Sequence, residues 1–382
     1  MPHEAAQAHS AQLITLIQKE INAAGGRISL ARYMELVLYA PGLGYYSAGS
    51  RKFGAEGDFV TAAEISPLFS RSLAHQVAEV LFGLGDGEVL EIGAGSGVMA
   101  ADMLAELEVV GQLPSRYIIL ELSADLRQRQ RQTLQARVPH LLDRLVWLEA
   151  LPESDFRGVM VANELLDALP VHSFCVQDEG IKERFVTWTD DGFQWLLDEP
   201  ESPQLAQGLK LIASELPVGY VSEINLAAEA WVASMAESLQ AGVILLLDYG
   251  FPQQEYYHPQ RHQGTLMCHY RHRAHDDPFV YPGLQDITSH VNFTAIAEAA
   301  VAAGLDVRGY TTQAFFLLAN GIVELAEKSN TGDERERLQA AQQIQTLTMP
   351  NEMGELFKVM ALSRKYDAGL RGFESQDLRN RL

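Results

Sequence analysis

Residues 89–97 read Val-Leu-Glu-Ile-Gly-Ala-Gly-Ser-Gly, an apolar strand that runs directly into three alternating glycines. A helical pattern of apolar residues follows from Val98. The segment therefore predicts a strand, a tight turn and a helix, which is the nucleotide-binding corner of a doubly wound α/β sheet. Glycines in such a turn let a ligand lie against bare backbone, because side chains there would block its approach.

The spacing of these glycines separates two classes of cofactor. A dinucleotide fingerprint has glycines at its first, third and sixth positions. Here Gly93, Gly95 and Gly97 occupy the first, third and fifth positions, and Val98 stands at the sixth. Glu91 would also place a negative charge beside any phosphate, whereas it suits the ammonium and sulfonium groups of S-adenosylmethionine. The corner therefore predicts S-adenosylmethionine as the cofactor.

The second half of the cofactor site is expected at the end of the next strand, residues 117–120. Glu121 ends this strand and can accept hydrogen bonds from both ribose hydroxyls, although a solvated charge at a strand end would look the same. Ser123 is the expected N-cap of the following helix. The predicted cofactor contacts are Glu91, Gly93, Ala94, Gly95, Gly97, Glu121, Leu122, Glu149, Asn163, Asp58 and Thr61.

Composition and charge exclude several other classes of protein. Hydrophobic residues make up 47% of the 382 residues, enough for a sizeable core. The net charge is -21, from 50 acidic against 29 basic residues. Nucleic-acid binding depends on clustered Lys and Arg, so we expect no nucleic-acid partner. The acidic surplus is compatible with a basic substrate, and also with a role in solubility alone.

Metal binding and membrane insertion are not expected either. Cys175 and Cys268 are the only cysteines, which suits a reducing compartment and provides no metal framework. The histidines of residues 258–275 lack the paired spacing of a zinc or iron site. The longest apolar stretches are too short to span a bilayer, and residues 1–12 have no apolar signal core. These observations predict a cytoplasmic protein without a membrane partner.

The order of predicted elements indicates an α/β protein of class I methyltransferase type. Seven strands are expected to form a Rossmann-like sheet, with the last strand antiparallel to the others. An N-terminal helical and loop region precedes this core, and a substrate lobe is inserted into it. The predicted segments are N-terminal helices and a cofactor-covering loop at 1–66, cofactor-binding core at 67–170, antiparallel insertion at 171–225, the rest of the core at 226–365 with an insertion at 249–291, and a tail at 366–382.

Five further phrases resemble one family of S-adenosylmethionine-dependent methyltransferases, that of mitochondrial dysgenesis protein A. The similarity runs in the family's order from about residue 30 to residue 365. It implies protein arginine methylation, since the mitochondrial member is an arginine methyltransferase that assembles respiratory complex I. The phrases are residues 39–46 (Tyr-Ala-Pro-Gly-Leu-Gly-Tyr-Tyr), 57–61 (Gly-Asp-Phe-Val-Thr), 163–170 (Asn-Glu-Leu-Leu-Asp-Ala-Leu-Pro), 283–291 (Gly-Leu-Gln-Asp-Ile-Thr-Ser-His-Val) and 353–359 (Met-Gly-Glu-Leu-Phe-Lys-Val).

Methyl transfer to a guanidinium needs carboxylates that hold the group and localise its charge. Asn163 and Glu164 follow the fourth predicted strand, beside the methyl group in this fold class, and Asp167 is expected one helical turn further on. We therefore predict Glu164, Asn163 and Asp167 as the catalytic residues, although Asp167 could equally cap a short helix. The loop at 57–61 is expected to cover the cofactor, with Asp58 or Thr61 near its methionine end.

Three functions remain open from the sequence. The first is a protein arginine methyltransferase whose partner is a protein with an exposed arginine. The second is a small-molecule methyltransferase on the same fold, which aromatic loops around the site would suit. The third is a cofactor-binding assembly factor without turnover. A homodimer is a further expectation.

Overall fold

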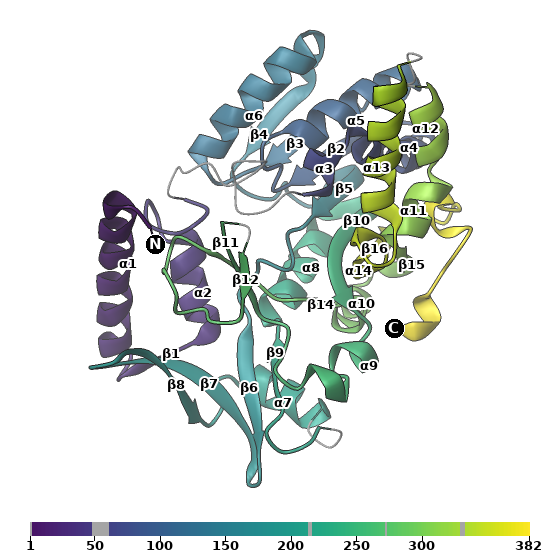
Figure 1. The fold of residues 1–382 in the computed structure, drawn as a ribbon. Coiled ribbons are helices and arrows are strands. Elements are labelled where there is room, and N and C mark those ends of the chain that lie inside the picture. The colour runs from purple at the N-terminus through teal and green to yellow at the C-terminus, as the bar shows by residue number, and fades with distance from the viewer. Residues whose placement is uncertain (1, 48–60, 213–215, 272, 329–332) are drawn as a thin grey trace. The chain divides into compact units, whose positions relative to one another are not determined.

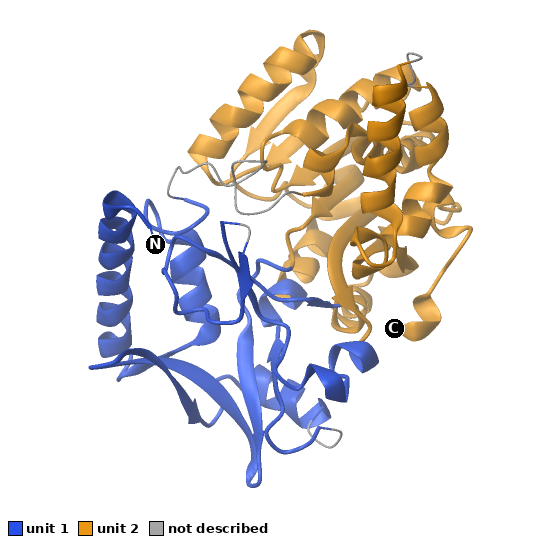
Figure 2. Cartoon of the chain, in the orientation of Figure 1, with its two compact units in different colours: residues 1–59, 167–229, 253–292 blue, residues 60–166, 230–252, 293–382 orange. Residues whose placement is uncertain are grey.

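In the computed structural model, the described residues are 2–47, 61–212, 216–271, 273–328 and 333–382, and the chain divides into two compact units (Figures 1 and 2). Unit 1 combines Met1–Phe59, Asp167–Glu229 and Gln253–Asn292, and unit 2 combines Val60–Leu166, Ala230–Pro252 and Phe293–Leu382. The grouping thus differs from the predicted segments. The N-terminal region and both insertions belong to one unit, because they pack on one another rather than forming separate parts.

The α/β sheet predicted from the sequence has eight strands, and seven of them, all in unit 2, follow one another along it (Figure 1). Its strand order is β15-β16-β10-β5-β2-β3-β4. The pairs from β10 to β4 are all parallel, whereas β16 is antiparallel to both of its neighbours. The prediction of a C-terminal antiparallel strand is therefore confirmed. The bounds are β2 Glu88–Ile92, β3 Tyr117–Leu120, β4 Leu145–Leu148, β5 Phe156–Asn163, β10 Leu239–Phe251, β15 Asp306–Thr312 and β16 Phe357–Arg364.

The central strands of this sheet are buried along nearly their whole length. In β10 and β5 apolar residues run continuously rather than alternating, as expected for strands with helices on both faces. The side chains of β2, β5, β10 and β16 pack with those of α4 and α5 in the main hydrophobic core. The helices are α3 Ala62–Ile65, α4 Pro67–Leu84, α5 Val98–Val109, α6 Ala124–Arg137, α8 Leu226–Ser238 (which crosses the border of the units), α10 Phe293–Ala302, α11 Gln313–Ala319, α12 Ile322–Lys328, α13 Glu334–Thr348 and α14 Met353–Leu356, with short 3₁₀ turns η1 Pro139–Arg144, η4 Arg371–Phe373 and η5 Arg379–Arg381.

The periodicity of residues 315–327 predicts one helix, but the structure has two, α11 and α12. Gly321 has φ 82°, a left-handed conformation that ends a helix. The Asn320 amide donates to the Phe316 carbonyl at 2.9 Å and so satisfies an acceptor at the end of α11. The apolar pattern continues across the break because both helices pack on the same core.

Unit 1 is built on antiparallel strands, as predicted for the first insertion. Strands β1, β7, β6 and β9 are neighbours in this order, β8 pairs with β7, and a second small sheet has the order β12-β11-β13. The bounds are α1 Glu4–Ala23, β1 Arg27–Ser29, α2 Leu30–Tyr39, β6 His172–Gln177, β7 Gly180–Thr189, β8 Gly192–Asp198, α7 Pro203–Ile212, β9 Val221–Ile224, α9 Gln253–Tyr256, η3 Pro259–Arg261, β11 Met267–Tyr270, β12 Arg273–His275, β13 Asp286–Thr288 and β14 Val291–Asn292.

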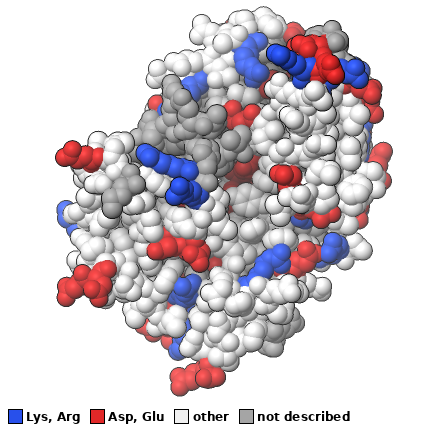
Figure 3. Space-filling model, in the orientation of Figure 1, with Lys and Arg blue, Asp and Glu red and all other residues white. Residues whose placement is uncertain are grey.

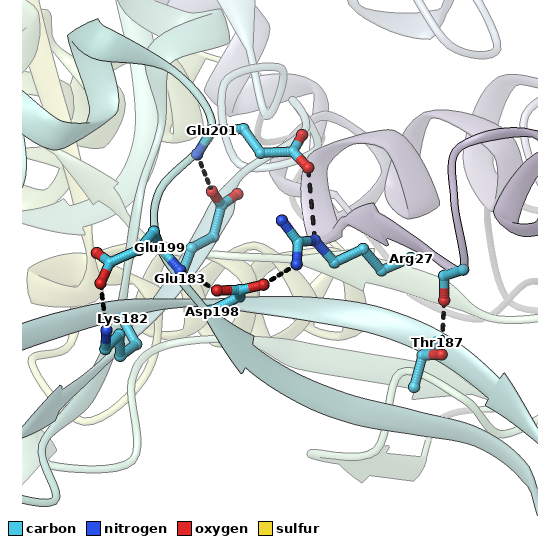
Figure 4. Close-up of polar contacts among 8 residues, drawn as sticks. Arg27, Lys182, Glu183, Thr187, Asp198, Glu199 and Glu201 are labelled. Atoms are coloured by element: carbon cyan, nitrogen blue, oxygen red, sulfur yellow. Dashed lines mark hydrogen bonds and ion pairs between the residues drawn. The ribbon is translucent and has the colours of Figure 1, made fainter.

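Polar contacts join the short strand β1 to the β7–β8 hairpin (Figure 4). The Arg27 guanidinium pairs with Asp198 and lies 3.5 Å from Glu201, and its face also covers the Phe185 ring. The Thr187 hydroxyl donates to the carbonyl of residue 26 at 2.7 Å. These contacts explain how three residues from the N-terminal region remain paired with an insertion more than 150 residues away in the chain.

Gly158 in β5 tests the packing of the central sheet. A Cβ there would lie 1.9 Å from the Glu88 carbonyl oxygen, and its φ is 149°. We expect Gly158→Ala to lower the free energy of unfolding by about 3 kcal/mol or more, because both overpacking and backbone strain oppose it. Gly111→Ala is the matched control: its φ is 73° but the added Cβ meets open space, so about 1–2 kcal/mol is expected. Equal urea midpoints for the two variants would contradict the assigned register.

Candidate active site

The turn between β2 and α5 is left-handed at all three of its glycines. Their φ angles are 72° at Gly93, 51° at Gly95 and 80° at Gly97. A Cβ on Gly97 would approach the Gln130 Cα to 3.0 Å, so this glycine allows α6 to pack closely. A Cβ on Gly95 would have no heavy atom within 4 Å. Gly95 therefore leaves open space beside the backbone, where a ligand can approach.

Helix α6 holds the backbone of this turn. Gln130, which is fully buried, donates from Nε2 to the Gly95 carbonyl at 3.1 Å and accepts from Trp147 Nε1 at 3.0 Å. The Thr133 hydroxyl donates to the Ser96 carbonyl at 2.8 Å. Because a glycine turn has few contacts of its own, these two bonds determine where its carbonyl groups point. The sequence analysis missed both residues.

Glu91 lies in β2, immediately before the turn, and is completely buried. Its Oε2 accepts a hydrogen bond from the Tyr117 hydroxyl at 2.5 Å. The pKa of Glu91 is raised to about 7, because burial and the nearby Glu121 charge raise it more than the Tyr117 hydrogen bond lowers it. Among the described residues its Oε1 has no hydrogen-bond partner. The predicted cofactor contact is thus a buried acceptor that still lacks a donor.

Glu121 ends β3, as predicted, and its carboxylate is fixed by two donors. Oε1 accepts from the Ser123 backbone N–H at 2.9 Å, and Oε2 accepts from Gln130 Nε2 at 3.1 Å. Burial raises the pKa of Glu121, while these hydrogen bonds oppose the increase. Ser123 also caps α6, as the sequence predicts. Gln130 therefore joins the two predicted halves of the cofactor site, the glycine turn and Glu121.

Glu164 follows β5 in a strained backbone conformation. Its φ is 50°, a left-handed value that side-chain-bearing residues adopt only at a cost. The Glu164 N–H donates to the Leu247 carbonyl at 2.9 Å. Asp248 Oδ2 then accepts from the backbone N–H groups of Leu165 at 3.1 Å and Leu166 at 2.8 Å. Asp248 therefore holds the Glu164 turn through the backbone.

The side chains of Glu164 and Asn163 contact each other and helix α3. Glu164 Oε1 accepts from Asn163 Nδ2 and from the Ala62 backbone N–H, each at 3.2 Å. Among the described residues, Asn163 Oδ1 is buried and has no hydrogen-bond partner. One strand end thus combines a fixed carboxylate with a buried amide oxygen that lacks a donor.

Asp167 belongs to unit 1, and no helix includes it. Residues 164–170 form bends and turns, so the predicted helical turn between Glu164 and Asp167 is wrong, and so is the alternative of a helix cap. Asp167 is buried, and its carbonyl accepts from Ser289 N–H at 2.9 Å. Burial raises the pKa of Tyr39, and the negative charges of Asp286 and Asp167 raise it further. Asp167 is therefore surrounded by aromatic and acidic residues of unit 1.

The remaining predicted cofactor contacts lie in different environments, and one of them lies outside the described residues. Leu122 is 75% exposed, and the side chain of Glu149 is 68% exposed and pairs with Arg127. Thr61 is the N-cap of α3. Asp58 lies in residues 48–60, outside the described part of the chain, so the cofactor-covering loop stays a prediction. Ala94 is buried within the glycine turn.

Of the residues that the sequence analysis missed, Gln130 had a weak signal and Glu64 had none. Gln130 stands one helical turn before Leu134, and these two are the buried residues of an otherwise polar helix. A polar residue at a core-facing position of a helix indicates a specific hydrogen-bond role. Glu64 lies in α3, and its carboxylate accepts from the Ser96 hydroxyl in the glycine turn. No local pattern predicts that contact, because the two residues are 32 positions apart.

The residues around the turn fit S-adenosylmethionine. Open space at Gly95 accommodates a ligand against the backbone. Among the described residues, the buried acceptor Glu91 Oε1 lacks a donor, and an ammonium group has three. Glu121 would hold ribose hydroxyls, and the excess of carboxylates favours a cation over a phosphate. Among the described residues there is no cluster of His, Cys, Asp and Glu able to hold a metal ion.

Residues 72–311 match a protein family described as "putative S-adenosyl-L-methionine-dependent methyltransferase". The chain belongs to this family. The match spans the glycine turn, Glu121 and the Glu164 turn, whereas helix α3 precedes it. The chain is an S-adenosylmethionine-dependent methyltransferase of the α/β fold predicted from its sequence.

Solved structures and curated relatives agree with this family. A crystal structure from Burkholderia thailandensis, bound to S-adenosyl-homocysteine, is 48% identical; the match covers 100% of this chain and 99% of that one, with a TM-score of 0.96. The mitochondrial protein arginine methyltransferase NDUFAF7 of Homo sapiens is 28% identical over 88% of this chain and 80% of its own length. The NDUFAF7 homologue of Drosophila melanogaster is also 28% identical, over 88% of this chain and 82% of its own.

The predicted cytoplasmic location is contradicted by these relatives, whose names place them in mitochondria. The prediction depended on the absence of an apolar signal core. That absence says nothing about import into mitochondria, because mitochondrial targeting segments are amphipathic rather than apolar. In the described part of the chain, no helix is both long and apolar enough to cross a membrane.

Substitution of Gly95 tests the glycine turn. We expect Gly95→Val to weaken binding of S-adenosyl-homocysteine at least 100-fold, because the side chain would fill the open space beside the backbone. Gly111→Val carries a similar left-handed backbone penalty but lies outside the turn, so it should retain the wild-type affinity. Isothermal titration calorimetry on both variants decides. Unchanged affinity of Gly95→Val would remove the turn from the cofactor site.

Replacement of Glu91 by glutamine tests its buried carboxyl. Its pKa rises from 4.5 to about 7 in the folded protein, so the folded state retains a proton that the unfolded state releases as pH increases. The free energy of unfolding therefore falls as the pH rises from 4.5 to about 7, by about 3 kcal/mol at most. Glu91→Gln has no such proton, so its stability relative to wild type should rise by up to that amount between about pH 4.5 and about pH 8. Urea unfolding without cofactor measures this; a constant difference would contradict the pKa.

Proposed function

We propose that this methyltransferase modifies arginine side chains of a protein. The curated relatives are named protein arginine methyltransferases and align with most of this chain. Their identity of 26–28% supports the reaction type without identifying the target protein. The proposed partner is a protein that presents an exposed arginine.

The chemistry of the acceptor sets the requirements for the site. When bound, S-adenosylmethionine supplies an electrophilic methyl group and leaves as neutral S-adenosyl-homocysteine. A guanidinium is charged and delocalised at neutral pH, so its nitrogens are poor nucleophiles. A carboxylate that accepts N–H bonds from the guanidinium localises the charge on part of the group, orients one nitrogen and can take up the proton that this nitrogen releases.

The observation that carries the proposal is the Glu164 turn. Its left-handed backbone is held by Leu247 and Asp248, so the carboxylate is fixed before any acceptor binds. Preorganised charge of this kind is the usual source of large electrostatic effects in catalysis. Asn163 Oδ1, a buried acceptor that lacks a donor among the described residues, lies on the adjacent residue. In this proposal both groups accept N–H bonds of the acceptor guanidinium.

Charge on the molecular surface is consistent with a basic protein substrate. The net charge is -21. Figure 3 shows acidic and basic side chains in small separate groups on one face, with no continuous basic patch among the described residues of that face. A long-range negative potential increases the rate of encounter with an arginine-rich segment and decreases at high salt.

The decisive experiment compares protein methylation with and without the enzyme. A lysate from cells lacking the chain is incubated with purified enzyme and S-adenosylmethionine carrying a labelled methyl group. Amino-acid analysis of the labelled protein should give methylarginine. Label confined to small molecules would support the small-molecule methyltransferase instead. Tight, stoichiometric cofactor binding without any transfer would support the assembly factor.

Glu164→Gln tests the role of the charge. The amide preserves shape and retains an oxygen for the Ala62 N–H, but it binds a cation poorly. We expect turnover to fall about 100-fold or more, as for loss of a preorganised electrostatic contact, with nearly constant affinity for S-adenosyl-homocysteine. Labelled methyl transfer and calorimetry measure the two quantities. Methylation at the wild-type rate would exclude Glu164 from the mechanism.

A further inference from the structure

Helix α3 lies in unit 2 between two of the turns described above. Its N-cap residue Thr61 makes no side-chain capping bond among the described residues. Instead Glu164 Oε1 accepts the Ala62 N–H at 3.2 Å, a role that an N-cap side chain normally fills. The same oxygen accepts from Asn163 Nδ2 at 3.2 Å, so the carboxylate is held on the strand side as well. One end of α3 is therefore attached to the Glu164 turn.

The other attachment of α3 is to the glycine turn. The Glu64 carboxylate accepts a hydrogen bond from the Ser96 hydroxyl. A bond from a hydroxyl to an ionised carboxylate is about twice as strong as a bond between neutral groups. The Ser96 carbonyl already accepts from Thr133 at 2.8 Å on α6. Ser96 is thus held from two sides, through its carbonyl by α6 and through its hydroxyl by α3.

Packing makes α3 a firm support for these contacts. Ala62 and Ala63 are buried and belong to the main hydrophobic core of unit 2. Ser66, which follows the helix, is also buried, and its hydroxyl caps α4 by accepting the Leu68 N–H at 3.2 Å. A four-residue helix has little stability alone, so these contacts hold it in place.

The charge of Glu64 also reaches the first helix after the turn. Burial raises the pKa of Asp102 in α5, Arg137 and Arg71 lower it, and the negative charge of Glu64 adds to the increase. Asp102 is bound by the Arg137 guanidinium at 3.2 Å. Glu64 therefore adds negative charge around a turn whose ligand carries positive charge.

We propose that Glu64 is a positioning residue of the cofactor site, and that α3 couples the glycine turn to the Glu164 turn. Glu64 fixes Ser96, and through it the turn against which the cofactor lies. The same helix receives the Glu164 carboxylate, so displacement of one turn is transmitted to the other. This role concerns cofactor binding alone. It is the same whichever acceptor is methylated, so it does not depend on arginine methylation.

Calorimetry with S-adenosyl-homocysteine on the full chain tests the positioning role. We expect Glu64→Gln and Ser96→Ala each to weaken binding about tenfold, since each removes the charge-assisted bond. The double variant should be little weaker than either single one, because both changes remove the same interaction. Glu108→Gln on α5 is the matched control: that carboxylate pairs with His140 at the surface, and its affinity should stay within twofold of wild type.

Thermal unfolding separates positioning from a general loss of stability. A purely structural Glu64 would lower the melting temperature and leave the folded protein with wild-type affinity, which would overturn the proposal. Affinity of Glu64→Gln within twofold of wild type would overturn it as well. If Glu64→Gln does not fold, Ser96→Ala decides alone, because it removes only the hydroxyl that Glu64 accepts from.

The coupling through α3 has its own test in Glu164→Ala. Alanine removes the acceptor for the Ala62 N–H, whereas Glu164→Gln keeps an amide oxygen there. We expect Glu164→Ala to weaken S-adenosyl-homocysteine binding about threefold or more, and its effect to be non-additive with that of Ser96→Ala. Strict additivity would show that α3 transmits nothing. None of these measurements uses a methyl acceptor. The positioning role of Glu64 can therefore be disproved without affecting the proposal of arginine methylation, and arginine methylation can be disproved without affecting the positioning role.

Discussion

The left-handed turn between β2 and α5 is the constraint on which the rest of the site depends. Three positive φ angles within five residues favour glycine at these positions. Because glycine has no side chain, the turn makes few contacts of its own. Its carbonyl groups are oriented by Gln130 and Thr133 of α6, and Ser96 is held by Glu64 of α3. The proposed cofactor surface is bare backbone, and the neighbouring helices supply the rigidity that this backbone lacks.

The site also contains buried carboxylates toward the carboxyl ends of parallel strands. Each is stabilised differently: Glu91 by the Tyr117 hydroxyl, Glu121 by Ser123 and Gln130, and Asp248 by backbone N–H groups. Burying such groups is costly unless donors offset the lost hydration. In the proposed cofactor site, this arrangement would concentrate negative charge where the cationic cofactor binds. The same charge disfavours a phosphate, which explains why this corner differs from a dinucleotide site.

The end of β5 shows how backbone strain can be kept at a functional position. A left-handed non-glycine residue costs about 1–2 kcal/mol. The Leu247 carbonyl and the Asp248 carboxylate bind three successive N–H groups from Glu164 onward and offset this cost. The result is a carboxylate whose backbone cannot relax to an ordinary conformation without breaking three hydrogen bonds. Asp248, which lies within β10, therefore acts on Glu164 through the main chain.

The sequence by itself determined the α/β sheet, the glycine turn and the place of Glu121, because strand periodicity and glycine spacing follow from backbone geometry along the chain. The methyltransferase family came from the resemblance of its further motifs. Only the tertiary structure decided that Gln130 joins the turn to Glu121 and that Glu64 reaches Ser96. It also placed Asp167 in the other unit, although the chain separates it from Glu164 by only three positions. Such contacts depend on how helices pack across tens of residues, and local pattern contains no information about that packing.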